Sequence, residues 1–175
     1  KYGNEYGNWS NHSKQEEEIK NYLNSFGFNF IKTRKLIDKE IDMYDSTLNL
    51  GIEYCGLYWH TDISPEPRLR SYHYEKYKKC LDHGVQLITI FGDEYNNRKE
   101  QVINRLKSLV GLNTRIHGRI CQVQKIDNET AFDFTNKNHI QKLKVPPKHS
   151  YGLYYNKILQ EVVTINHHHR KNNIY

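Results

Sequence analysis

The sequence predicts an α/β domain in which a β-sheet lies between helices. Residues 85–91 form a continuous apolar run between two glycines, which is typical of a strand covered on both faces. Two shorter β-prone segments, 41–45 and 48–54, read as a hairpin. Segments 13–26 and 71–83 carry apolar residues at helical spacing. Helices are therefore expected on the faces of the sheet.

The first part of the chain begins with a polar leader over residues 1–12. Ser13 followed by Glu16 fits a helix capping box, and Gly27 is a suitable stop. Residues 28–31 then look like a strand. The apolar face of the predicted helix consists of Ile19, Tyr22, Leu23 and Phe26.

A loop and a second helix are expected after the hairpin. Residues 61–70 contain two prolines and few periodic apolar residues, which predicts an irregular loop. Residues 71–83 then fit a helix. Its predicted apolar face consists of Tyr74, Tyr77, Cys80 and Leu81.

Two acidic residues directly follow the strand over 85–91. Asp93 and Glu94 precede a helix expected from Asn96 to Gly111, and acidic groups near a helix N-terminus favour the helix dipole. We therefore assign them a structural role, with catalysis as the alternative. The apolar face of this helix consists of Val102, Ile103, Leu106, Leu109 and Val110.

Residues 113–175 are expected to form a small α+β extension to a first domain over residues 1–112. Its predicted elements are a strand over 119–126, a helix over 129–138 and a hairpin of strands 151–155 and 158–165.

Charge is distributed unevenly between these two parts. The net charge is +6, and residues 113–175 carry all of it, with 10 Lys+Arg and 4 Asp+Glu. A basic extension favours contact with a phosphate backbone, and a solvated tail is the plain alternative.

No apolar run approaches the roughly 20 residues that a membrane span requires, and no signal-peptide pattern opens the chain. We therefore expect a cytoplasmic protein without a membrane partner. Because the chain begins with Lys1 and not Met, we expect that residues precede it. The cysteines are too widely spaced for a zinc ribbon, so buried thiols are expected at Cys55, Cys80 and Cys121.

Two carboxylates lie within the strands of the predicted hairpin. Glu53 stands in the apolar run from Ile52 to Cys55, where burial without a partner would cost on the order of several kcal/mol. Asp42 stands on the preceding strand, so strand pairing would bring it beside residues 53 and 54. Oxygen ligands of this kind suit Mg²⁺. A solvated Asp at a strand end is an equal alternative.

Four segments, taken in order, resemble the EDxHD homing endonucleases: SKQEEEI, EIDMY, IEYCGLYWH and YHYEKYKKCLDHGVQLITIFGDEY. That family is related to very-short-patch repair endonucleases and belongs to the PD-(D/E)XK class. The resemblance covers roughly Ser13 to Val110. It implies a central mixed sheet flanked by helices, and metal-dependent hydrolysis of double-stranded DNA.

The resemblance also implies a set of metal ligands. Asp42 would hold Mg²⁺, with Mn²⁺ as a substitute, together with the main-chain carbonyl near Tyr54 and the carboxylate of Glu53. Glu16 matches the first catalytic carboxylate of the family, because it stands in the Ser-x-x-Glu position. Sequence alone does not separate Glu16 from Glu18.

Three further residues complete the implied catalytic set. His60 suits proton transfer at neutral pH, since an unperturbed histidine has a pKa of about 6.5. His73 stands where the mismatch-repair relatives have an aspartate. Cys55 stands where the conventional lysine is expected, and a thiol does not replace an ammonium group. Lys76 would supply that charge, together with the two histidines.

Predicted DNA contacts come from basic and aromatic residues around the same strands. The basic run over 32–35 is either a solvated loop or a contact to a DNA phosphate. The side chain of Trp59 either packs within the protein or wedges between DNA bases. The predicted DNA-binding residues are Arg34, Lys35, Trp59, Arg68 and Arg70.

The leading hypothesis is a Mg²⁺-dependent endodeoxyribonuclease, acting in the host cytoplasm if a phage encodes it. A catalytically inactive nucleic-acid-binding relative is the alternative, because of Cys55 and His73. An acyl-transferring enzyme built on residues 113–175 is a third hypothesis. The sequence does not determine the DNA target, whether one or both strands are cut, or whether the protein forms a homodimer.

Overall fold

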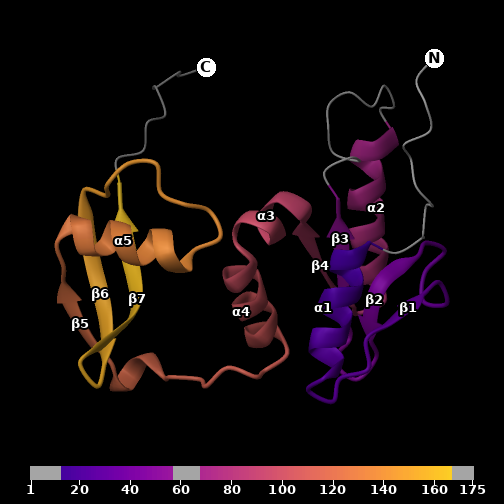
Figure 1. The fold of residues 1–175 in the computed structure, drawn as a ribbon, viewed down its shortest axis with the longest axis horizontal. Coiled ribbons are helices and arrows are strands. Elements are labelled where there is room, and N and C mark those ends of the chain that lie inside the picture. The colour runs from indigo at the N-terminus through magenta and orange to yellow at the C-terminus, as the bar shows by residue number, and fades with distance from the viewer. Residues whose placement is uncertain (1–12, 57–67, 167–175) are drawn as a thin grey trace. The chain divides into compact units, whose positions relative to one another are not determined.

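The computed structural model describes residues 13–56 and 68–166 (Figure 1). The chain forms two compact units, Lys1–Asn97 and Arg98–Tyr175. The domain boundary predicted after residue 112 marks the end of the part that was expected to resemble a nuclease. That boundary stays a prediction.

The first unit contains a four-stranded sheet in the order β1-β2-β3-β4. β1, β2 and β3 pair in antiparallel fashion, whereas β3 and β4 are parallel. The sheet is therefore mixed, and helices flank it as expected (Figure 1). The strands are β1 Ile31–Thr33, β2 Ile41–Asp45, β3 Leu50–Cys55 and β4 Gln86–Phe91.

The described part of this unit contains the helices α1 Lys14–Asn24, α2 Arg68–Asp82 and α3 Gly92–Asn97. The side chain of Ser13 accepts a hydrogen bond from the N–H of Glu16 at 3.0 Å, which confirms the predicted N-cap of α1. Ile19 and Leu23 of α1 are fully buried, as their helical spacing predicts.

The turn between β2 and β3 is fixed by one buried carboxylate. Asp45 accepts hydrogen bonds from the N–H groups of Thr47 at 2.8 Å and Leu48 at 3.1 Å. It also accepts one from the N–H of Asn29 at 2.8 Å. The hairpin predicted around Asp45 is therefore present, and this carboxylate holds its register.

The predicted apolar face of α2 is wrong. Tyr74, Tyr77 and Leu81 are exposed, whereas Cys80 is buried and the side chain of Lys76 is only 4% exposed. Lys76 and Cys80 are four residues apart, so they share one helix face. That face turns inward because Lys76 meets a buried carboxylate.

Several boundaries differ from the predictions. The strand expected over 28–31 is found at Ile31–Thr33, and α2 begins at Arg68 inside the expected loop. The helix expected from Asn96 is two helices, α3 and α4 Lys99–Leu109, separated at Arg98. Asp93 and Glu94 lie in the first turn of α3, which agrees with a structural role.

The second unit contains α4 and a three-stranded antiparallel sheet in the order β5-β6-β7. α5 lies across β6 and β7 (Figure 1). The hairpin predicted around Asn156-Lys157 is confirmed, and both turn residues have positive φ. The remaining strands and α-helix are β5 Gln122–Lys125, α5 Asn128–Asn138, β6 His149–Tyr155 and β7 Ile158–Ile165. The strand predicted over 119–126 is shorter than expected, because Gly118–Ile120 forms a short 3-10 helix before β5.

Cys55 and Cys80 are buried and Cys121 is partly exposed, and all three thiols are free. None of the helices in the described part of the chain has the length and apolarity that crossing a membrane requires.

Candidate active site

Asp42 on β2 and Glu53 on β3 lie side by side. The main-chain N–H of Asp42 donates to Oε1 of Glu53 at 3.2 Å. The main-chain N–H of Tyr54 donates to Oδ2 of Asp42 at 3.0 Å. Strand pairing therefore brings Asp42 beside residues 53 and 54, as predicted. The contact with Tyr54 that the structure shows is through its N–H group, whereas the sequence analysis assigned a role to its carbonyl.

α2 contributes the positive charge of this site. Nζ of Lys76 forms an ion pair with Oε2 of Glu53, and both side chains are buried. Removing two charges from water is costly, and this cost is recovered only when the charges are paired and hydrogen-bonded. Lys76 thus stands at the carboxylate pair, where the sequence predicted a positive charge.

A third carboxylate comes from α1. Glu16 is buried, whereas Glu18 is exposed, so the helix itself separates the two candidates. Oε1 of Glu16 lies 3.3 Å from Nζ of Lys32 on β1. Burial is the main cause of the raised pKa of Asp42, and the negative charge of Glu16 adds to it.

Burial dominates the protonation of these acids. It raises the pKa of Glu53 to about 7, and the charge of Asp42 adds to the effect while Lys76 opposes it. Burial also raises the pKa of Asp42, which the hydrogen bond from Tyr54 partly offsets. A cation bound between these carboxylates would favour their charged forms and so oppose this effect of burial.

Cys55 does not act as a nucleophile at neutral pH in this setting. Burial raises the pKa of its thiol to about 11, and the charges of Glu53 and Asp42 contribute. Only the thiolate is an effective nucleophile. Cys55 is therefore a packing residue at the end of β3.

The donor set matches a hard divalent cation in its chemistry. Asp42 and Glu53 offer carboxylate oxygens, and Mg²⁺ is commonly held by one or two carboxylates while it keeps several waters. Within residues 13–56 and 68–166, no cluster of three or more His, Cys, Asp or Glu side chains is arranged to hold a metal. A cation at this site would thus rely on the Asp42–Glu53 pair and on water.

The roles of the other predicted site residues stay predictions. Trp59 and His60 lie outside the described residues. Arg68 and Arg70 belong to the first turn of α2. His73, one turn before Lys76, makes an edge-to-face ring contact with Tyr72, with ring centroids 5.6 Å apart. The catalytic role of His73 stays a prediction.

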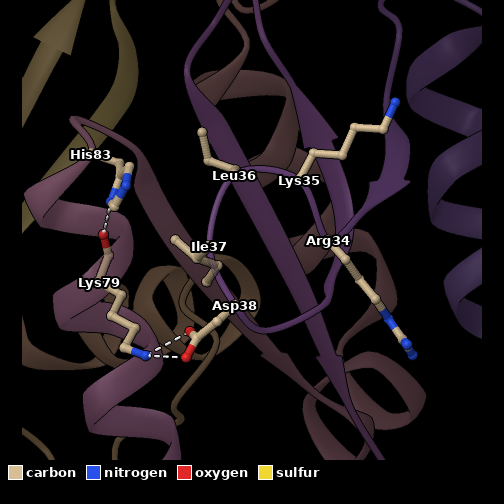
Figure 2. Close-up of a pocket in the computed structure, with 7 residues that line it drawn as sticks. All are labelled: Arg34, Lys35, Leu36, Ile37, Asp38, Lys79 and His83. Carbon is tan, nitrogen blue, oxygen red and sulfur yellow. Dashed lines mark hydrogen bonds and ion pairs between the residues drawn. The ribbon is translucent and has the colours of Figure 1, made fainter.

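Arg34 and Lys35 line a separate pocket of about 500 Å³ (Figure 2). Nζ of Lys79 lies 2.6 Å from Oδ1 of Asp38 across this pocket, and His83 follows directly after the end of α2. The side chains of Arg34 and Lys35 point away from the Lys79–Asp38 pair (Figure 2). Arg34 instead pairs with Glu40 at 2.8 Å. The basic side chains that line this pocket therefore do not converge on one point.

Sequence reasoning missed Lys32 and Glu40 as members of the site. Nζ of Lys32 lies 3.1 Å from Oε1 of Glu40, in addition to its contact with Glu16. The basic run over 32–35 pointed to charge on β1 but not to its partners. An acid just before β2 was the available signal, since adjacent antiparallel strands bring their ends together.

No family model, curated protein or solved structure matches this chain.

Proposed function

We propose that this chain is a metal-dependent endonuclease that hydrolyses phosphodiester bonds in double-stranded DNA. The observation that carries the proposal is the buried Lys76–Glu53 ion pair with Asp42 beside it. A buried pair is often no more stable than apolar residues of the same size, so folding alone gives little reason for three charged groups there. Functional sites are where such perturbed groups gather.

Each residue has a role that its position supports. Asp42 and Glu53 would hold a divalent cation, which when bound supplies charge stabilisation at the phosphate and activates a water. The ammonium group of Lys76 would stabilise negative charge that develops on the phosphate oxygens. Glu16 would orient the attacking water by accepting its hydrogen bond. His60 is proposed to carry the proton.

The fold agrees with this proposal at the level of topology. An antiparallel pair, β2 and β3, is followed through α2 by a parallel strand, β4. The carboxylates stand on β2 and β3, and the lysine stands on the connecting helix. We propose that this arrangement is of the PD-(D/E)XK type, with the lysine on the helix in place of the position that Cys55 occupies.

The basic charge of residues 113–175 supports DNA as the substrate. Ten Lys+Arg against four Asp+Glu favour contact with a polyanion. The proposed activity would be exerted in the cytoplasm, in a host cell if a phage encodes the chain.

The experiment is cleavage of supercoiled plasmid by the purified chain with Mg²⁺ or Mn²⁺, and with chelator. Wild type should convert plasmid to nicked or linear forms only with the metal. Asp42→Asn keeps the shape of the side chain and its bond from Tyr54 but removes its charge, so it should lose at least about 100-fold in rate.

Asp38→Asn is the matched control, because Asp38 is an exposed acid of the same unit that pairs with Lys79. It should cleave at the wild-type rate. Cleavage that survives Asp42→Asn would overturn the proposed mechanism. DNA binding without cleavage on any substrate would instead favour the inactive nucleic-acid-binding relative.

A further inference from the structure

We propose that Lys32 is a positioning residue for this reaction, and that it holds the carboxylate of Glu16 in place. The inference rests on the proposed function and adds a residue that the sequence analysis assigned only to a basic run. Lys32 would act through Glu16 and would not touch the phosphate.

The geometry is a bridge between three segments. Glu16 lies on α1, Lys32 on β1, and Glu40 directly before β2. Nζ of Lys32 is 3.3 Å from Oε1 of Glu16 and 3.1 Å from Oε1 of Glu40. Oε2 of Glu40 accepts a hydrogen bond from Nε of Arg34 at 2.8 Å. Arg34 thus fixes Glu40, and Glu40 helps to fix the ammonium group that faces Glu16.

The burial of the carboxylates separates this bridge from ordinary surface pairs. Among ion pairs between described residues, the carboxylates of Glu17, Glu40, Glu75 and Asp38 are 30–66% exposed. The side chains of Glu16 and Glu53 are each only 9% exposed. Both buried carboxylates of the site therefore have a lysine of their own, Lys32 for one and Lys76 for the other.

Glu16 needs such a partner because its side chain is buried. A buried carboxylate without a cation would turn toward water. The ammonium group of Lys32 holds the carboxylate of Glu16 in its inward position. Groups that orient a functional side chain in this way commonly affect activity about 10- to 100-fold when they are removed.

The experiment measures single-turnover cleavage of plasmid with Mg²⁺, the Kd for the same DNA without divalent metal, and the unfolding temperature. The variants are Lys32→Met, Lys32→Arg, Glu16→Gln and the double variant Lys32→Met/Glu16→Gln. Lys39→Met is the matched control, because Lys39 is also largely buried and pairs with Glu75 at 3.3 Å within the same unit.

Lys32→Met should lower the cleavage rate by about 10- to 100-fold and leave the Kd for DNA within about twofold. Lys32→Arg should retain most of the rate, because it restores the cation. The double variant should be no slower than the slower single variant, because residues that act as one unit are not additive. Lys39→Met should cleave like wild type.

The proposal is overturned if Lys32→Met cleaves at the wild-type rate, if the losses of Lys32→Met and Glu16→Gln multiply, or if Lys39→Met loses as much. Glu16→Gln with wild-type activity overturns it alone, even if Lys32→Met does not fold. A wild-type chain that cuts no DNA refutes the proposed function and removes this inference with it, whereas an active wild type with an unaffected Lys32→Met refutes the inference alone.

Discussion

Among individual residues, Glu53 links folding most closely to the proposed chemistry. Its carboxyl group is buried beside Asp42 and Lys76, so each protonation state of Glu53 alters the charge of the whole cluster. The same group that would hold a cation therefore also makes stability depend on pH.

The pH dependence of stability should reveal Glu53. Its pKa is about 7 in the folded state against 4.5 ordinarily, so its contribution to the free energy of unfolding is complete below pH 4.5 and is lost as the pH rises through 7. The loss is up to about 3 kcal/mol. Urea denaturation should show this decline from pH 4.5 to 7 in wild type and not in Glu53→Gln. Equal slopes in both proteins would contradict the assignment.

Removing Lys76 should cost more than removing both partners. Lys76→Met leaves Glu53 buried without a counter-charge, which should lower the free energy of unfolding by about 3–5 kcal/mol at pH 8. Lys76→Met/Glu53→Gln should recover most of this loss. Lys79→Met should change stability little, because its partner Asp38 is exposed. A double variant as unstable as Lys76→Met would argue against a direct pair.

Strand pairing predicted that Asp42 lies beside residues 53 and 54, and the apolar run around Glu53 predicted a partner for its carboxylate. Lys76 was expected at the site only because of the family resemblance. The sequence did not decide whether Glu16 or Glu18 is the catalytic carboxylate, because both lie in the first turns of one helix. Only the packing of that helix shows which of the two side chains is buried. Sequence reasoning missed the Lys32 bridge because Lys32 and Glu40 become neighbours only when β1 and β2 pair.

Among the elements, the β2–β3 hairpin and α2 build the site. The hairpin was predictable because turn residues separate two β-prone segments. The inward face of α2 was not, since a helix with Tyr74, Tyr77 and Leu81 on one face and Lys76 on another would ordinarily bury the first. The need of Glu53 for a cation is a tertiary effect that outweighs this periodicity.

Gly51 should be essential to the packing of β3. A Cβ at Gly51 would lie 2.8 Å from Cδ1 of Leu87 and 3.3 Å from Cγ2 of Ile41. Gly51→Ala should therefore lower the free energy of unfolding by about 1–3 kcal/mol. Gly56→Ala is the control, because a Cβ there meets nothing within 4 Å. Urea denaturation of both variants tests this, and equal stability of the two would show that β3 is not packed as described.

At the level of the whole molecule, the two units differ in charge and in predictability. The hairpin and helix of the second unit were predicted to within a few residues, because their local patterns are strong. The functional division after residue 112 was argued from charge, whereas the compact units divide at Asn97 and Arg98.

The basic second unit should contribute to DNA affinity without affecting cleavage chemistry. Lys142→Gln/Lys144→Gln removes two exposed cations. It should weaken DNA binding and reduce the slope of log K against log salt by about 0.9 for each phosphate that these lysines neutralise. Fluorescence anisotropy without divalent metal measures this, with the exposed Lys14→Gln as control. An unchanged slope would mean that these lysines do not bind DNA.

The most direct test of the central claim is the unfolding temperature of the free protein titrated with Mn²⁺, because it does not depend on knowing the DNA target. Wild type should gain stability with metal, about 2.7 kcal/mol at one hundred times the Kd. Asp42→Asn should gain none, and Asp38→Asn should gain as much as wild type. Equal metal-induced stabilisation of wild type and Asp42→Asn would contradict a cation site at Asp42 and Glu53.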